Sequence, residues 1–87
     1  MKTADTSDRT SARLLDILCR VLLAEGLPTE GITADTHLFD DAGVDSLLLI
    51  SFLLEVEAEL DMVIEFEELD YADLSTIGRL TAALGAA

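Results

Sequence analysis

Basic residues are scarce in this sequence, whose 87 residues include 5 lysines and arginines against 18 acidic residues, a formal net charge of -13 at pH 7. Proteins bind nucleic acids largely through Lys and Arg contacts to phosphates. The only candidates for such contacts are Lys2, Arg9, Arg13, Arg20 and Arg79. The charge balance therefore argues against a nucleic-acid partner and favours basic proteins as partners.

Cysteine and long apolar runs are also rare. The single cysteine, Cys19, cannot form an internal disulfide, and the longest nearly unbroken apolar run, residues 47–54, covers eight residues where a membrane span needs about 20. The residues before Leu14 lack the apolar core of a secretory signal peptide. We therefore expect a protein of the reduced cytoplasm with no membrane partner.

Apolar residues make up 51% of the chain, which is enough to fold despite the charge. A chain of this length forms one domain and buries roughly 60 to 65% of its unfolded surface. Residues 1–8 are polar and without periodicity, so we expect a flexible N-terminal tail followed by a domain over residues 9–87.

The first apolar pattern has helical spacing and runs from Leu14 to Leu22, ending at Gly26 and Pro28. Cys19 lies on this helix, and we interpret it as a small, buried or half-buried residue without chemistry of its own. The following connection, residues 27–45, is long for a small domain, and such loops are usually functional or pinned by apolar residues. Leu38 and Phe39 are the expected pins.

No metal site is expected. The lone His37 has no second histidine with which to build a zinc site, so we interpret it as a surface loop residue. A calcium loop starting at Asp40 would need side-chain oxygens where Ala42 and Val44 stand, and glycine where Asp45 stands. The acidic loop therefore fails the test for an EF-hand.

A second helix is expected from Ser46 to Leu60, with Asp45 as its N-cap. One face is apolar enough to cover a small core: Leu49, Phe52, Leu53, Val56 and Leu60. A nearly opposite face, which also includes Ser51 and Ala58, carries three further apolar residues: Leu47, Ile50 and Leu54. Such a helix is either central in a tight bundle or presents a partner-binding stripe, and we favour the stripe, with all three residues substantially exposed.

After Asp61, the VIEFE segment alternates like a strand but has no partner strand, so we expect a loop leading to a short helical turn around residues 66–71. Ser75 then caps a last helix, whose inward face is formed by Ile77, Leu80, Ala83 and Leu84. The predicted fold class is all-α, with three main helices, one short helix and a long first loop.

Ser46 is the residue that carries chemistry in this prediction. The sequence argues against a serine hydrolase, because the only histidine lies nine residues before Ser46 and no oxyanion loop is recognisable. Free amides and the helix dipole instead favour a phosphate ester on its hydroxyl, although Asp45 opposes that charge in part. Ser46 is thus predicted to be an attachment point.

The segment LFDDAGVDSLLLISFLLEVEAEL, residues 38–60, resembles the acyl carrier protein signature, in which Gly-x-Asp-Ser-Leu leads into the second helix of a four-helix bundle. Gly43, Asp45, Ser46 and Leu47 stand at the motif positions, and the resemblance covers about residues 10–85. It implies a carrier and not an enzyme. A phosphopantetheinyl transferase would attach 4′-phosphopantetheine from coenzyme A to Ser46, and the arm's thiol would carry an acyl or aminoacyl thioester.

The resemblance also implies a partner-recognition surface beside that serine, formed by Asp45, Leu47, Ile50, Ser51, Leu54 and Glu57. Twelve acidic residues and no basic one lie from Asp40 to Asp73, and the acids expected to steer basic partner enzymes are Asp45, Glu55, Glu57 and Glu59. Expected partners are the transferase, an acyl- or aminoacyl-loading enzyme, and acyltransferase or synthase domains. The carrier itself is expected to be a monomer.

The apolar run LLLISFLL departs from carriers of fatty acid synthesis by placing Leu48, Ile50 and Ser51 on or beside the recognition surface. This favours a discrete carrier of polyketide or mixed polyketide and nonribosomal peptide biosynthesis. An aminoacyl or peptidyl carrier loaded by an adenylating enzyme is the alternative, because some free-standing aminoacyl carriers also use Asp-Ser. A small acidic interaction domain without a prosthetic group is the alternative from another class.

Overall fold

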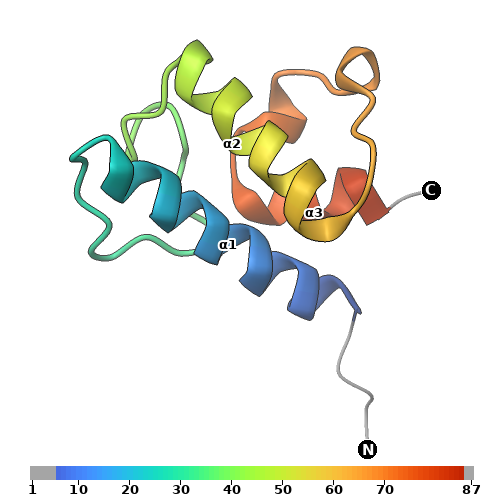
Figure 1. Ribbon diagram of the computed structural model, residues 1–87, viewed down its shortest axis with the longest axis horizontal. Helices are drawn as coiled ribbons and strands as arrows, with labels where there is room; N and C mark the ends of the chain where they lie inside the picture. Colours follow the sequence, from blue (N-terminus) through green and yellow to red (C-terminus); the bar gives the residue numbers. More distant parts are fainter. Residues whose placement is uncertain (1–5, 86–87) are drawn as a thin grey trace, which may run out of the picture.

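The computed structural model describes residues 6–85, and within that range the regular structure is entirely helical. Three α-helices are present, α1 (Thr6–Ala24), α2 (Ser46–Leu60) and α3 (Ile77–Gly85), with two short 3-10 turns, η1 (Phe66–Glu68) and η2 (Ala72–Leu74), between α2 and α3. Helices α1 and α2 run antiparallel, so that the end of α1 and the start of α2 lie at the same end of the molecule (Figure 1). The all-α prediction is confirmed.

Three details differ from the sequence-based expectation. The single short helical turn expected around residues 66–71 is two separate 3-10 turns, η1 and η2, with residues 69–71 between them. Helix α1 begins at Thr6, within the segment expected to be a tail, while residues 1–5 lie outside the described part. The last helix is capped by Thr76 and not by Ser75, because the Thr76 Oγ1 atom accepts the Arg79 N–H at 3.0 Å. The Ser75 hydroxyl instead donates to the carbonyl of Ala72 at 2.7 Å and closes η2.

The core forms where the inner faces of the helices meet. The side chains predicted for the inner face of α2 are buried or, for Leu60, half-buried, and Phe52 is the largest fully buried residue. Helix α3 contributes Ile77 and Leu80, while Ala83 and Leu84 are only half-buried. From α1 come four buried residues: Leu14, Ile17, Leu18 and Leu22.

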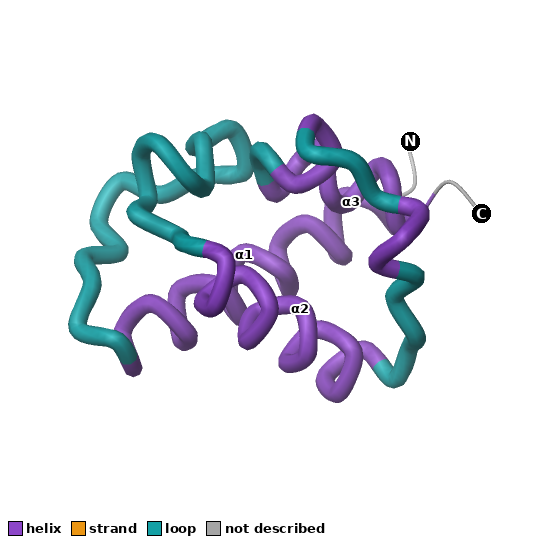
Figure 2. The backbone as a smooth tube through the Cα atoms, turned by 90° about the horizontal axis from the view of Figure 1, so that it is seen from above, coloured by secondary structure: helices purple, strands orange, loops and turns teal. Residues whose placement is uncertain are grey.

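The long connection between α1 and α2 is tied to the region before α3, and Figure 2 shows it as a loop that folds back along the helices. Leu38 is fully buried, and its N–H donates to the Ser75 carbonyl at 2.8 Å. The Gly78 N–H donates in turn to the Ala34 carbonyl at 3.0 Å. Phe39, the second expected pin, is only half-buried and holds the loop by stacking on Tyr71, with ring centroids 5.2 Å apart.

Candidate functional site

The start of α2 is fixed by the residues just before it. Gly43 has φ +80, a left-handed conformation that glycine adopts without strain, and the next residue, Val44, is buried in the core. Asp45 is extended, and its Oδ1 atom accepts the Leu48 N–H at 2.8 Å. This is the expected N-cap, and it sets Ser46 as the first residue of the helix.

Ser46 is exposed at this position. Within residues 6–85, no carbonyl or side chain accepts a hydrogen bond from the N–H of Ser46 or Leu47, so both donors face solvent at the positive end of the helix. The histidine that a hydrolase would need is engaged within its own loop, because His37 Nδ1 accepts the Asp40 N–H at 3.1 Å. The geometry therefore gives an accessible hydroxyl beside free amides, with one nitrogen of His37 already engaged in the loop.

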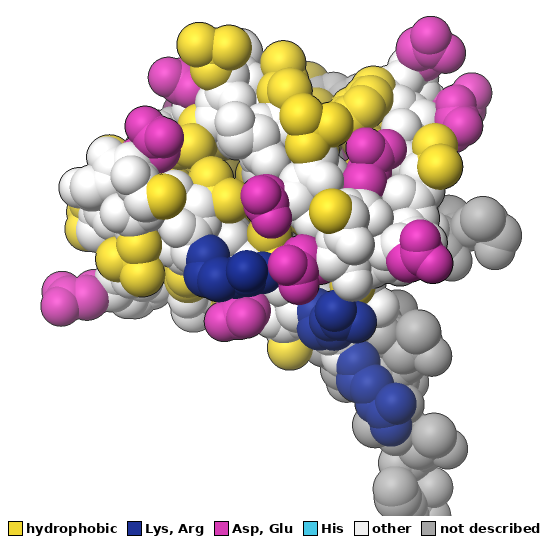
Figure 3. Space-filling view, viewed as in Figure 1, with side chains coloured by type: hydrophobic (Ala, Val, Ile, Leu, Met, Phe, Trp, Pro, Cys, Tyr) yellow, Lys and Arg dark blue, Asp and Glu magenta, His cyan; other side chains and the backbone are white. Residues whose placement is uncertain are grey.

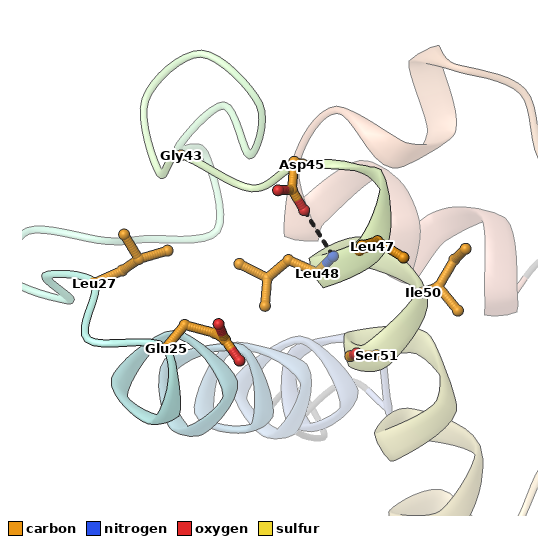
Figure 4. A pocket seen from close by; sticks show the side chains of 8 residues that line it. All are labelled: Glu25, Leu27, Gly43, Asp45, Leu47, Leu48, Ile50 and Ser51. Atoms are coloured by element: carbon orange, nitrogen blue, oxygen red, sulfur yellow. Dashed lines mark hydrogen bonds between the residues drawn. The ribbon is translucent and has the colours of Figure 1, made fainter.

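The outer face of α2 is apolar and open to solvent. Leu47 is 77% exposed, Ile50 50% and Leu54 52%, which confirms that these three side chains do not belong to the core. Ser51 lies exposed among them. The expectation for Leu48 was wrong, since that side chain is only 8% exposed and turns away from Leu47 and Ile50, toward the end of α1 (Figure 4).

Two of the acidic residues predicted for partner recognition have structural roles. Glu57 is half-buried, and its Oε2 atom accepts the Ile64 N–H at 2.7 Å, which anchors the loop after α2. Asp45 serves as the helix cap. Glu59 pairs with Arg20 at 3.5 Å, whereas Glu55 is exposed on the same helix.

The positive charge that reaches α2 does so near the C-terminal end of that helix, at Glu59, and not beside Ser46. On the face shown in Figure 3, the dark blue side chains lie along α1, in the lower part of the view. The coloured side chains in the upper part of the view, where α2 lies, are apolar or acidic. Arg13, from α1, donates to the backbone carbonyl of Glu59 at 3.2 Å. The exposed apolar stripe of Leu47, Ile50 and Leu54 is therefore surrounded by acidic side chains (Figure 3).

A groove beside the start of α2 was missed by the sequence reasoning. It has a volume of about 590 Å3 and is lined by Glu25, Leu27, Gly43, Asp45, Leu47, Leu48, Ile50 and Ser51. Gly26, at φ +75, ends α1, and the Leu27 N–H returns to the Leu22 carbonyl at 2.9 Å, which turns the chain toward α2. A glycine followed by leucine after a helix is the sequence signal that could have indicated this turn.

The other candidate residues show little sign of reactivity. Burial, with a smaller contribution from the negative charge of Asp16, raises the pKa of the half-buried Cys19 thiol. Across the described part of the chain, no three His, Cys, Asp or Glu side chains are grouped so that they could hold a metal ion. No helix there is long and apolar enough to cross a membrane.

Comparison with known proteins connects this geometry to a family. The phosphopantetheine attachment site family matches residues 12–84, which include all of α2 and the groove. No curated protein sequence matches the chain significantly. Domains of this family hold a covalently attached 4′-phosphopantetheine and interact with phosphopantetheinyl transferases and with synthases or ligases. The chain belongs to the phosphopantetheine-binding carrier domains, which carry intermediates for partner enzymes and are not themselves catalysts.

Proposed function

We propose that Ser46 is the residue that bears the phosphopantetheine arm. The observation that supports this is the position of Ser46 as the exposed first residue of α2, with the unpaired N–H groups of Ser46 and Leu47 beside its hydroxyl. A phosphodiester on that oxygen would lie at the positive end of the helix dipole, where an anion is stabilised. The residues present therefore fit the group, although the carboxylate of Asp45 offsets part of the attraction.

The arm would supply a terminal thiol on which an acyl group is held as a thioester. We propose that the protein is a discrete acyl carrier that delivers this group to enzymes of polyketide or mixed polyketide and nonribosomal peptide biosynthesis. The apolar outer face of α2 supports this choice, because a stripe of Leu47, Ile50 and Leu54 provides a small docking surface beside the attachment point. An aminoacyl carrier loaded by an adenylating enzyme is the second candidate.

Fast but weak docking suits a carrier that visits several enzymes in turn. The negative surround of the stripe supports recognition by basic partners, since complementary charge raises association rates more than affinity. A net charge of -13 also opposes association between two copies, so we propose that the carrier is a monomer. We further propose that it works in the cytoplasm, with which its single cysteine, unable to form an internal disulfide, is consistent.

Intact mass spectrometry tests the attachment. The purified protein is measured before and after incubation with coenzyme A, magnesium and a broad-specificity phosphopantetheinyl transferase, next to Ser46→Ala. Ser51→Ala is the matched control, because Ser51 is also exposed on α2. We expect one phosphopantetheine to be added to the wild type and to the control and none to Ser46→Ala.

A folded, unmodified sample that gains no mass, while a known carrier is modified in the same assay, would contradict the proposal. It would favour instead an acidic interaction domain in which Ser46 only begins a helix. A gain that persists in Ser46→Ala would place the arm on another residue.

A further inference from the structure

The groove beside the start of α2 is positioned to receive whatever Ser46 carries. Figure 4 shows its two walls, the first turns of α2 on one side and the end of α1 with the following turn on the other. Asp45 and Leu47, the neighbours of Ser46 in sequence, both line it. A flexible arm on the serine hydroxyl would therefore start beside the groove.

The lining combines apolar side chains with carboxylates. Leu27 and Leu48 face each other across the groove, and the Glu25 carboxylate is turned toward α2 between them and Ser51 (Figure 4). No lysine, arginine or histidine is part of the lining. Glu25 forms no ion pair with a side chain of residues 9–84.

Two arginines of α1 contact Glu59 and not the groove. Arg20, one turn before the end of α1, pairs with Glu59 at 3.5 Å, and Arg13 donates to the Glu59 backbone. Asp45 adds a second negative charge, of which its cap bond uses only the Oδ1 atom. The groove thus offers an apolar surface under a negative potential, which suits a ligand that is part apolar and part cationic.

We infer that the groove holds an amine-bearing acyl group, such as an α-aminoacyl group, with its ammonium facing Glu25. This inference rests on the proposed attachment to Ser46. Of the two cargo classes proposed above, it favours the second candidate, an aminoacyl carrier, over a carrier of acyl groups without an amine. An acyl group with a free carboxylate, such as a malonyl group, would be repelled by Glu25 and Asp45. A neutral acyl group would gain only the apolar contact with Leu27 and Leu48.

Two nearly isosteric cargoes separate charge from shape. Alanyl and isobutyryl groups differ by an ammonium in place of a methyl, and each is joined to coenzyme A through a stable amide and loaded by the transferase. Intact mass first confirms loading, and the ¹H–¹⁵N NMR spectra of the two loaded forms are then compared at low and high salt. The variants are Glu25→Gln, which keeps the shape of the side chain, and Glu30→Gln, an exposed acid outside the groove lining, as the matched control.

With alanyl cargo we expect amide chemical-shift changes at Glu25, Leu27, Leu48 and Ser51 that exceed those with isobutyryl cargo by roughly two- to five-fold. An exposed ion pair raises the equilibrium constant for occupying the groove by about that factor. The excess should disappear in Glu25→Gln or at high salt and remain in Glu30→Gln. Equal shifts from both cargoes, or shifts confined to the neighbours of Ser46, would overturn the inference and leave the attachment intact. Failure to load would overturn the proposed function itself, and the cargo assignment with it.

Discussion

The hydrogen bond from the Leu48 N–H to Asp45 Oδ1 is the contact that defines where α2, and with it Ser46, begins. Asp45→Ala removes both the acceptor and the charge, whereas Asp45→Asn keeps an oxygen in the same place and removes only the charge. The two variants therefore separate the geometry of the cap from its electrostatics.

The magnitudes follow from the contact. Loss of an N-cap acceptor destabilises a protein by about 1 kcal/mol, and asparagine caps nearly as well as aspartate. A negative charge at a helix N-terminus contributes about 0.3 to 1 kcal/mol, but here its loss also relieves repulsion in a chain of net charge -13. We expect Asp45→Ala to be about 1 kcal/mol less stable than Asp45→Asn, which corresponds to a difference in Tm of about 4 to 8 °C.

Urea and thermal unfolding followed by circular dichroism measure both variants, with Glu30→Gln as a control for the removal of one exposed charge. Equal destabilisation by the alanine and asparagine variants would refute the role of the hydrogen bond. A stability gap between the wild type and Asp45→Asn that closes in high salt would report the charge of Asp45, whereas the gap between the asparagine and alanine variants should persist in high salt.

Four further predictions follow from other contacts. Glu57→Ala leaves the N–H of Ile64 without its acceptor and should lower the free energy of unfolding by about 1 to 3 kcal/mol in urea denaturation. Glu55→Ala, at an exposed site, should change it by less than about 0.5 kcal/mol, and similar values for the two variants would contradict the anchoring role of Glu57. Asp61→Asn should stabilise the protein by about 0.3 to 1 kcal/mol at low salt, because Asp61 places a negative charge at the C-terminus of α2 in a left-handed conformation that asparagine tolerates, and an unchanged Tm would count against this. Cys19 should react with iodoacetamide at pH 8 more slowly in the folded protein than in urea, because its raised pKa leaves less thiolate; equal rates would contradict the effect of burial. Glu55→Lys should slow association with the transferase in stopped-flow measurements more at low salt than at high salt, and an equal slowing at both would remove the steering argument.

Helical periodicity predicted the exposed stripe and the inner face of α2, because both depend only on the positions of side chains along one helix. Periodicity did not predict the burial of Leu48, because this residue lies between the two faces of α2. Its side chain is buried and turned toward the end of α1 (Figure 4), which the sequence does not place beside it. Likewise, either Ser75 or Thr76 could cap α3 from the sequence alone. The Ser75 hydroxyl donates to the Ala72 carbonyl of η2, which leaves Thr76 as the residue that caps the helix.

The start of α1 at Thr6 shows a related limit. Apolar periodicity marks only the part of a helix that packs against the core, so a polar extension leaves no such signal. The groove could not be predicted from the sequence, because its walls come from segments about 20 residues apart. Glu25 and Leu27 lie beside the first turns of α2 only because the chain turns at Gly26. Ser46 could be singled out from sequence because its motif, cap and helix start are all local.

The acidic residues of α2 divide into those that build the fold and those that a partner can meet. Asp45 and Glu57 each accept a backbone N–H, so replacing either one changes structure as well as charge. A test of partner recognition that used them would therefore confuse unfolding with loss of docking. Glu55 is exposed on the same helix, one residue after Leu54, and the part of the chain that the structure describes gives it neither a hydrogen bond nor an ion pair. Electrostatic steering of partners is thus best assigned to acids like Glu55, with the apolar stripe supplying the short-lived contact that follows the encounter.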